Sequence, residues 1–204
     1  MEASDEWRQV RRSDEFRGGP IDNPPARVIV NNDHSIIRRL RMDVLKVYQY
    51  ALQREFEGKR FFEENAGRLS HSAAVGAFKN LAAEEQKHID FIQDLIDRIK
   101  KGESPNLSMA KEMQNEGFFS QRAISESIDS KTLEAMVPDL PILRMAYLIE
   151  RDFAEFYEKA AKEAEGEVKE ALTMLASWEH GHEELFQQFH DKAFQEYSKM
   201  PWGG

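Results

Sequence analysis

The sequence predicts an all-α protein whose body is a four-helix bundle built from two similar helical hairpins. The composition favours helices, because Ala, Glu, Lys, Leu and Arg are all frequent and 41% of the residues are apolar. In several segments the apolar residues recur at alternating spacings of four and three, which is typical of helices that pack nearly antiparallel. The second half of the chain also repeats the pattern of the first half, which indicates a duplicated hairpin.

The first hairpin is predicted over residues 42–102. Gly67 is expected to end its first helix and Gly102 its second, because glycine readily adopts the left-handed conformation that closes a helix. Ser70 or Ser72 is expected to cap the start of the second helix. The inward-facing residues of the first helix are Leu45, Tyr48, Leu52, Glu55, Phe62 and Ala66, and those of the second are Ala74, Phe78, Leu81, Glu85, His88, Ile92, Leu95 and Ile99.

The second hairpin is predicted over residues 141–198, after a crossover at 103–140 that is too long for a tight turn. The crossover has weak helical patterns around Ser108–Gln114 and Ser120–Ile128. A turn near Gly166 is expected to separate the third and fourth helices. The inward-facing residues of the third helix are Leu143, Ala146, Glu150, Phe153, Tyr157, Ala160 and Ala164, and those of the fourth are Val168, Leu172, Leu175, Glu179, His182, Phe186 and Phe189.

The two ends of the chain do not follow this helical pattern. Residues 1–41 are predicted to be a largely irregular N-terminal extension, since glycines and prolines interrupt mixed charges in its first part. Arg27–Val30 is either a short strand that pairs with another subunit or a piece of a plain tail. Residues 199–204 are expected to be a C-terminal tail. The bundle is therefore expected to occupy residues 42–198.

The composition also argues against several classes of partner and cofactor. A formal net charge of −9 disfavours nucleic acid, because phosphate binding needs a basic surface. The chain has no cysteine, which excludes disulfides, thiolate zinc sites, iron–sulfur clusters and thiol nucleophiles. No run of about 18 apolar residues is present, so we expect no membrane partner. The first residues have no secretory pattern, and we therefore expect a cytoplasmic protein.

The internal repeat includes polar residues on lines that should face the core. Residues 51–66 resemble residues 146–161, and residues 81–93 resemble residues 175–187, at a nearly constant offset. Each inward-facing glutamate lies at a similar distance from the predicted turn of its hairpin, so antiparallel packing should bring the glutamates to one level. The inward-facing polar residues that recur are Glu55 with Glu150, Glu85 with Glu179, and His88 with His182.

Four buried carboxylates at one level require compensating charge. Burying an ionised carboxylate costs several kcal/mol or more, and neighbouring carboxylates repel each other. Two divalent cations would balance four carboxylates, and a Glu and a His three residues apart on a helix can reach the same ion. Oxygen-rich ligation with one imidazole per ion suits iron or manganese better than structural zinc. The alternative is a hydrogen-bonded polar layer that holds no metal.

Two residues beside these six, Tyr157 and Trp178, have two interpretations each. Tyr157 lies two helical turns after Glu150, and either hydrogen-bonds a ligand carboxylate from a neighbouring helix or reaches another buried acceptor. Its counterpart Phe62 has no hydroxyl, so the two metal environments are expected to differ. Trp178 is either a packing residue or an electron relay, and packing is favoured. The remaining acidic neighbours are expected to be solvated; they are Glu84, Glu183 and Glu184.

Two Glu-x-x-His motifs and two lone glutamates at this spacing resemble the rubrerythrin-like branch of the ferritin-like superfamily. The resemblance covers about 43–100 and 141–192, and it matches Glu55, Glu85–His88, Glu150 and Glu179–His182 to the family's ligands. It implies a ferritin-like four-helix bundle with a long crossover between helices two and three. It also implies a catalytic centre of two iron ions, in which manganese or zinc could substitute, that reacts with peroxide or dioxygen. A homodimer is likewise expected from the resemblance.

Two departures from the family pattern affect the expected activity. Full rubrerythrins carry a rubredoxin domain whose cysteines hold an iron that supplies electrons, and this chain has no cysteine. Many also have a further glutamate three residues after the third-helix ligand, where this chain has Phe153. Sustained turnover would therefore need an external electron donor.

Three functional hypotheses follow. The leading one is a non-haem di-iron oxidoreductase that carries out peroxide reduction or ferroxidation. The second is an iron-binding or sequestration protein whose centre does not turn over. The third is a helical interaction module that the metal stabilises and whose N-terminal extension recruits a partner.

Overall fold

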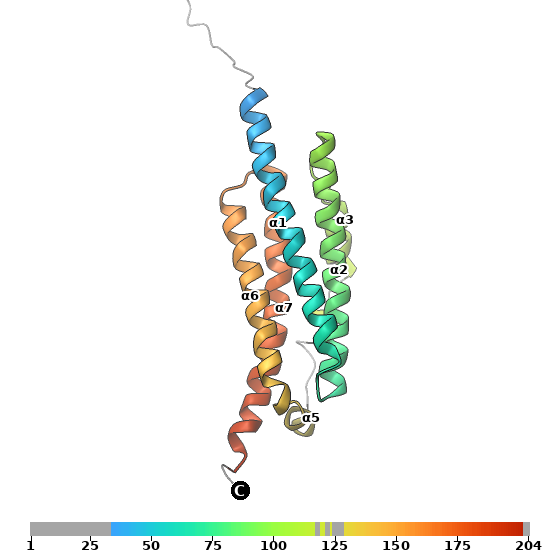
Figure 1. The fold of residues 1–204 in the computed structure, drawn as a ribbon, viewed down its shortest axis with the longest axis vertical. Helices are drawn as coiled ribbons and strands as arrows, with labels where there is room; N and C mark the ends of the chain where they lie inside the picture. The colour runs from blue at the N-terminus through green and yellow to red at the C-terminus, as the bar shows by residue number, and fades with distance from the viewer. Residues whose placement is uncertain (1–33, 117–118, 121–122, 124–128, 202–204) are drawn as a thin grey trace, which may run out of the picture. The chain divides into compact units, whose positions relative to one another are not determined.

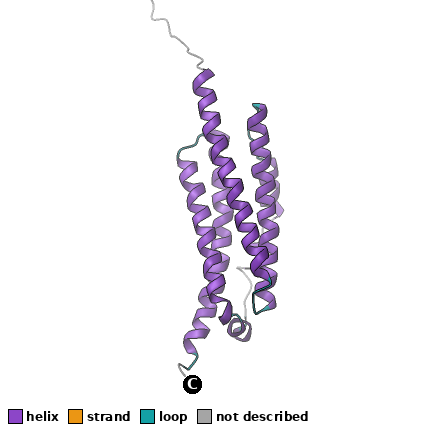
Figure 2. Ribbon diagram, viewed as in Figure 1, coloured by secondary structure: helices purple, strands orange, loops and turns teal. Residues whose placement is uncertain are grey.

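The computed structural model describes residues 34–116, 119, 120, 123 and 129–201. Over these residues the chain folds into helices and turns, and they include no strand (Figure 2). The four long helices are α1 (His34–Ala66), α2 (Ser72–Lys101), α6 (Leu140–Lys162) and α7 (Gly166–Lys199). The crossover contains α3 (Ser108–Glu116), α5 (Ser130–Ala135) and a 3₁₀ turn, η1 (Val137–Asp139).

The long helices form two hairpins that pack together as the sequence predicts. α1 packs along α2, α6 packs along α7, and α1 also contacts α6 (Figure 1). The α2–α6 connection is the long crossover, part of which contacts α7 through α5. This arrangement confirms the prediction of a ferritin-like all-α bundle made from two hairpins.

Two apolar clusters fill the bundle, one toward each end of the long helices. In the first, Leu95, Phe91 and Trp178 are buried with Tyr157. The second contains four phenylalanines whose rings contact one another, with the Phe62 and Phe186 rings stacked at a centroid distance of 5.3 Å. The four phenylalanines are Phe62, Phe78, Phe186 and Phe189. The residues that separate these clusters along the helices are the polar ones predicted to face the core.

The helix ends agree with the predictions in part. Gly67 follows the last residue of α1, and Gly102 closes α2 with a left-handed φ of 78°. The prediction that Ser70 or Ser72 caps α2 is wrong. The cap is His71, whose Nδ1 accepts a hydrogen bond from the backbone N–H of Ala73 at 3.2 Å. An imidazole nitrogen can replace a serine hydroxyl here because the cap needs only an acceptor that reaches the first free amides.

The boundaries differ from the expected ones at the first helix. α1 begins at His34, ahead of the boundary expected at residue 42. Residues 1–33, including the Arg27–Val30 segment, lie outside the described residues, so their predicted irregularity stays a prediction. α3 coincides with the weak helical pattern predicted at Ser108–Gln114. Most of the second weak pattern, at Ser120–Ile128, also lies outside the described part.

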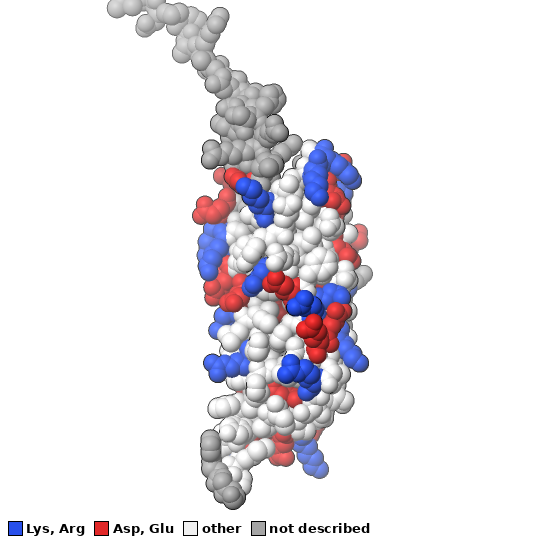
Figure 3. Space-filling view, in the orientation of Figure 1, with Lys and Arg blue, Asp and Glu red and all other residues white. Residues whose placement is uncertain are grey.

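The surface of the bundle carries both signs of charge. Figure 3 shows acidic and basic side chains interspersed along the face in view. Several of them pair along one helix, as Lys59 does with Glu63 and Lys159 with Glu155. Across the described helices, none combines the length and the hydrophobicity that a bilayer crossing requires.

Replacing Gly102 by alanine should destabilise the fold, because a side chain at this φ meets the following carbonyl. We expect the free energy of unfolding to fall by about 1–2 kcal/mol in Gly102→Ala, as measured by urea denaturation. Gly67→Ala is the control, since a Cβ there meets no atom within 4 Å, and it should change the free energy by less than about 0.5 kcal/mol. Equal losses in the two variants would contradict this assignment.

Candidate metal centre

Each of the four long helices contributes to one polar cluster in the middle of the bundle. All six predicted residues are completely buried, with 0% of each exposed. The structure brings all six together. α1 supplies Glu55, α2 supplies Glu85 and His88, α6 supplies Glu150, and α7 supplies Glu179 and His182. Because the Glu and His of each motif lie three residues apart, both point from one face of their helix.

One half of the cluster surrounds the imidazole of His88. Its Nδ1 lies 2.9 Å from Glu179 Oε1 and 3.2 Å from Glu55 Oε2. Glu85 Oε2 lies somewhat farther away, at 3.6 Å. Three carboxylates from three different helices therefore face a single ring nitrogen.

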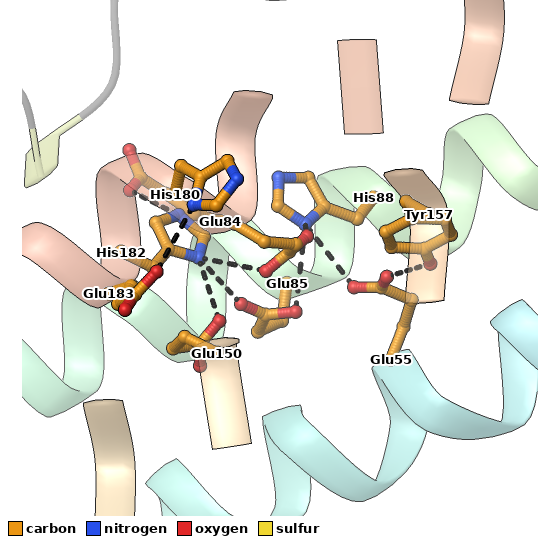
Figure 4. Close-up of polar contacts among 10 residues, drawn as sticks. Glu55, Glu84, Glu85, His88, Glu150, Tyr157, His180, His182 and Glu183 are labelled. Atoms are coloured by element: carbon orange, nitrogen blue, oxygen red, sulfur yellow. Dashed lines mark hydrogen bonds and ion pairs between the residues drawn. The ribbon is translucent and has the colours of Figure 1, made fainter. Parts of the chain in front are cut away.

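The other half has the same arrangement around His182. Its Nδ1 lies 3.0 Å from Glu85 Oε1 and 3.4 Å from both Glu150 Oε2 and Glu179 Oε2. Figure 4 shows the contacts of this imidazole with Glu85 and Glu150. The two imidazole rings are nearly parallel, with centroids 5.2 Å apart and an interplanar angle of 13°.

Glu85 and Glu179 belong to both halves. Each directs one carboxylate oxygen to the Nδ1 of His88 and the other to the Nδ1 of His182. In contrast, Glu55 contacts only the first imidazole, and Glu150 only the second, among the ion pairs of the described residues. From the imidazoles that they face, we call Glu85 and Glu179 the bridging carboxylates and Glu55 and Glu150 the terminal carboxylates.

The cluster fits a pair of cations. Both carboxylate oxygens of Glu85, of Glu150 and of Glu179 are buried and have only imidazole Nδ1 atoms as ion-pair partners among the described residues, without the geometry of a hydrogen bond. Buried oxygens of this kind are costly unless something binds them. Ligand atoms of Glu85, His88, Glu179 and His182 all lie within 4.8 Å of one another, close enough to hold metal. Glu55 and Glu150 extend this group at its two ends. That these six side chains are metal ligands stays a prediction.

Tyr157 lies beside one terminal carboxylate. Its hydroxyl donates a hydrogen bond to Glu55 Oε1 across the bundle (Figure 4). Burial, followed by the neighbouring charge of Glu55, raises the pKa of Tyr157 well above its usual value, so the phenol stays a donor. Phe62, its counterpart in the first repeat, instead packs in the phenylalanine cluster. The two ends of the centre therefore differ as expected.

Ionisation of the terminal carboxyls is unfavourable in the metal-free protein. Burial, and then the negative charges of Glu179 and Glu85, raise the pKa of Glu55 well above 4.5. Burial and then the charge of Glu85 raise the pKa of Glu150 in the same way. In both groups the metal-free protein therefore favours the neutral carboxyl more strongly than water does.

The pKa shifts of the imidazoles and of the bridging carboxyls favour the charged form of each group. Burial opposes protonation of both imidazoles, but the surrounding carboxylates outweigh it and raise the pKa of His88 and of His182 well above 6.5. Burial also opposes ionisation of Glu85 and Glu179, yet the imidazolium charges lower the pKa of both carboxyls. The imidazolium form of each histidine and the ionised form of each bridging carboxyl therefore stabilise one another, and cations would compete with protons at these groups.

Glu84 is the residue that the sequence analysis misplaced. It was expected to be solvated, but only 5% of it is exposed. Its Oε2 lies 3.3 Å from Nε2 of His182, and its Oε1 accepts a hydrogen bond from the backbone N–H of Phe119 at 2.5 Å. Burial opposes ionisation, but the contact with His182 outweighs it and lowers the pKa of Glu84. The apolar residue at the equivalent position of the second repeat, Trp178, was the available signal that this position is buried.

The other residues beside the two motifs differ in their burial. Glu184 is exposed, as predicted. Glu183 is only half-buried at the surface, where its carboxylate pairs with Arg151 at 2.7 Å and with His180 at 3.1 Å. Trp178 is buried, with its ring stacked on His88 and in contact with Phe91, which agrees with a packing role.

Phe153 occupies the position where many family members carry a further glutamate. Its ring is buried, and only 2% of the residue is exposed. Gly58 is its counterpart in the first repeat and leaves room for the ring, because a Cβ on Gly58 would lie 2.9 Å from Phe153 Cε2. The guanidinium carbon of Arg54 lies 4.6 Å from the centre of the same ring. An apolar side chain thus closes this flank of the centre.

Comparison with known proteins agrees with the geometry. A family model described as Rubrerythrin matches residues 46–190, a range that contains all six clustered residues. No curated protein and no solved structure matches the chain. The match covers well over half of the sequence and confirms the resemblance seen in the motifs.

The stability of the metal-free protein should fall as the pH rises. Glu55, Glu150 and both imidazoles bind protons more tightly when folded, so their contribution is complete below the unfolded pKa values of 4.5 and 6.5 and is lost as pH rises through the folded values. The lowered pKa of Glu85 has the opposite effect, but only at acid pH.

Urea denaturation between about pH 5 and pH 9 measures this dependence. The free energy of unfolding should decrease over this range without metal and increase after loading, because metal ligands must lose their protons. A metal-free protein that becomes more stable toward pH 9 would contradict the charge assignment.

Removing the two bridging carboxylates should abolish metal loading. We expect the Glu85→Gln, Glu179→Gln double variant to retain none of the about two ions per chain that the ligand set accommodates. Metal analysis after dialysis against Fe(II) under nitrogen measures the loss. Glu184→Gln, an exposed carboxylate on the same helix as Glu179, is the control and should load fully. Full loading of the double variant would show that the ligands lie elsewhere.

Proposed function

This chain belongs to the rubrerythrin family, and from that premise we propose that it is a non-haem di-iron protein that reacts with peroxide or dioxygen. The observation that supports the proposal most strongly is the pair of bridging glutamates, Glu85 and Glu179, each with one oxygen toward each imidazole. Oxygen-rich ligation with one imidazole per ion favours iron, or manganese, over zinc.

The six side chains would divide the work of holding two ions. Glu85 and Glu179 would keep the ions at a fixed separation, and their flexible carboxylates could bind through one oxygen or two. His88 and His182 would fix one ion each through Nδ1. Glu55 and Glu150 would bind at the two ends, where a cation would oppose the burial and the carboxylate repulsion that raise the pKa of each.

The apolar clusters around the centre suit a redox reaction from which bulk water is excluded. When bound, two ferrous ions would supply the two electrons that, with two protons, convert one hydrogen peroxide into two waters. The apolar clusters on both sides limit water to the immediate site. Tyr157 would hold Glu55 in one orientation by donating a hydrogen bond from its hydroxyl to Oε1. An external electron donor would be needed to restore the reduced state.

A second candidate is iron binding without sustained turnover. Phe153 supports it, because this side chain cannot bind a metal where many relatives have a further carboxylate. The missing cysteines also deprive this chain of the iron site that supplies electrons in full rubrerythrins. Both candidates share the same metal centre and differ in whether it can be reduced again.

Anaerobic loading followed by peroxide distinguishes the candidates. We expect one equivalent of hydrogen peroxide to oxidise about two Fe(II) ions per chain faster than it oxidises Fe(II) in buffer, as followed by stopped-flow absorbance. Chemical reduction should then restore the reaction for further cycles. A slow, single oxidation that reductant does not reverse would favour sequestration. Stoichiometric loading without faster oxidation would contradict the redox proposal.

A further inference from the structure

In each Glu-x-x-His motif the residue just before the glutamate reaches the histidine of the other motif. Glu84, which precedes Glu85, lies against His182, with Oε2 to Nε2 at 3.3 Å. Trp178, which precedes Glu179, stacks on the imidazole of His88 with ring centroids 5.0 Å apart and an interplanar angle of 20°. The repeat thus places an ionisable carboxylate on one imidazole and an indole at the equivalent position on the other.

The contact with Glu84 determines which nitrogen of His182 can bind a cation. The Nδ1 atom faces Glu85, Glu150 and Glu179, so a cation there leaves the ring proton on Nε2. Glu84 Oε2 is the carboxylate oxygen that faces this nitrogen, at an ion-pair distance of 3.3 Å (Figure 4). A carboxylate on the outer nitrogen fixes the tautomer and makes the imidazole a stronger ligand.

Glu84 is itself held in place. Its other oxygen accepts the hydrogen bond from the backbone N–H of Phe119, a residue of the crossover. Ser120, the next residue, is also buried and lies close to α7, since a Cβ on Gly181 would be 3.7 Å from its Oγ. The crossover therefore anchors the carboxylate that contacts His182, and the side chain loses little further freedom when a cation binds.

The corresponding position on the His88 side provides no charge. The Trp178 indole offers a flat apolar surface that covers the ring and excludes water. The two halves also differ at their terminal carboxylates, since Tyr157 donates a hydrogen bond to Glu55. That hydrogen bond withdraws electron density from the Glu55 carboxylate. Glu84, in contrast, places negative charge beside the outer nitrogen of His182.

We propose that Glu84 is a positioning residue that fixes His182 for metal binding and makes the Glu150–His182 half of the centre the tighter of two unequal metal positions. The proposal rests on the di-metal function proposed above and deepens it. It assigns an order of loading, in which the His182 half fills first and the Glu55–His88 half exchanges its ion more readily.

Calorimetric titration of the metal-free protein with Co(II), under conditions where Co(II) is not oxidised, tests the proposal. The wild-type chain should bind in two resolved steps. Glu84→Gln keeps the size of the side chain but removes its charge, and it should weaken the tighter step about 10- to 100-fold while leaving the other step unchanged. Trp178→Phe is the matched control at the equivalent position of the second repeat, and it should leave the tighter step unchanged.

Variants that disable one half at a time assign the steps. In a Glu55→Gln background the remaining step should weaken when Glu84→Gln is added. In a Glu150→Gln background adding Glu84→Gln should have no effect. As a second readout, proton NMR of the Co(II) protein should show a shifted, exchangeable Nε2–H signal from His182, and Glu84→Gln should accelerate its exchange with solvent.

Several results would overturn the proposal. Equal weakening of both steps, or a lower stability of the metal-free Glu84→Gln protein with unchanged Co(II) affinities, would mean that Glu84 only anchors the crossover. If Glu84→Gln does not fold, Glu84→Asp can replace it, because the shorter side chain keeps the charge but moves it away from His182. An unchanged affinity of the tighter step in Glu84→Asp would also contradict the proposal. A wild-type chain that binds no Co(II) would instead refute the metal centre itself.

Discussion

The structure depends on the cost of enclosing four carboxylates and two imidazoles between apolar clusters. Without cations, burial and carboxylate repulsion raise the pKa of Glu55 and of Glu150, and the carboxylates raise the pKa of His88 and of His182 in spite of burial. Two divalent ions would compete with protons at these groups and bind buried oxygens that otherwise face imidazole nitrogens. The same requirement fixes the packing of the hairpins, because sliding one against the other would separate the ligands and leave charge unpaired in the core.

Duplication explains both the symmetry of the centre and its differences. Each hairpin supplies one terminal glutamate and one Glu-x-x-His motif, so the two halves have equal ligands. The surroundings have diverged between the copies, as shown by Phe62 opposite Tyr157 in the alignment of the repeats. The pair Gly58 and Phe153 is complementary as well, since the small residue of one copy makes space for the ring of the other. Two ions held in such a centre need not be chemically equivalent.

The sequence was sufficient for the fold and for the six clustered residues, because helical spacing and the repeat both depend on periodic positions. It failed where a contact depends on the crossover, which has no repeat counterpart. Glu84 was expected to be solvated because it points away from the line of inward-facing residues, yet the backbone of Phe119 and the ring of His182 contact it. His71 gave no capping signal, because an imidazole caps a helix only when its ring is turned toward a free amide. The contacts of Glu84 follow from tertiary packing, and the His71 cap follows from a local side-chain orientation; periodicity predicts neither.

Diffraction at the iron absorption edge, from crystals of the iron-loaded protein, tests the central claim most directly. The account predicts two anomalous peaks within one chain, one bonded to Nδ1 of His88 and the other to Nδ1 of His182. Glu85 and Glu179 should each contact both peaks. A single peak, or iron held by other side chains while the six residues contact only water and one another, would contradict it.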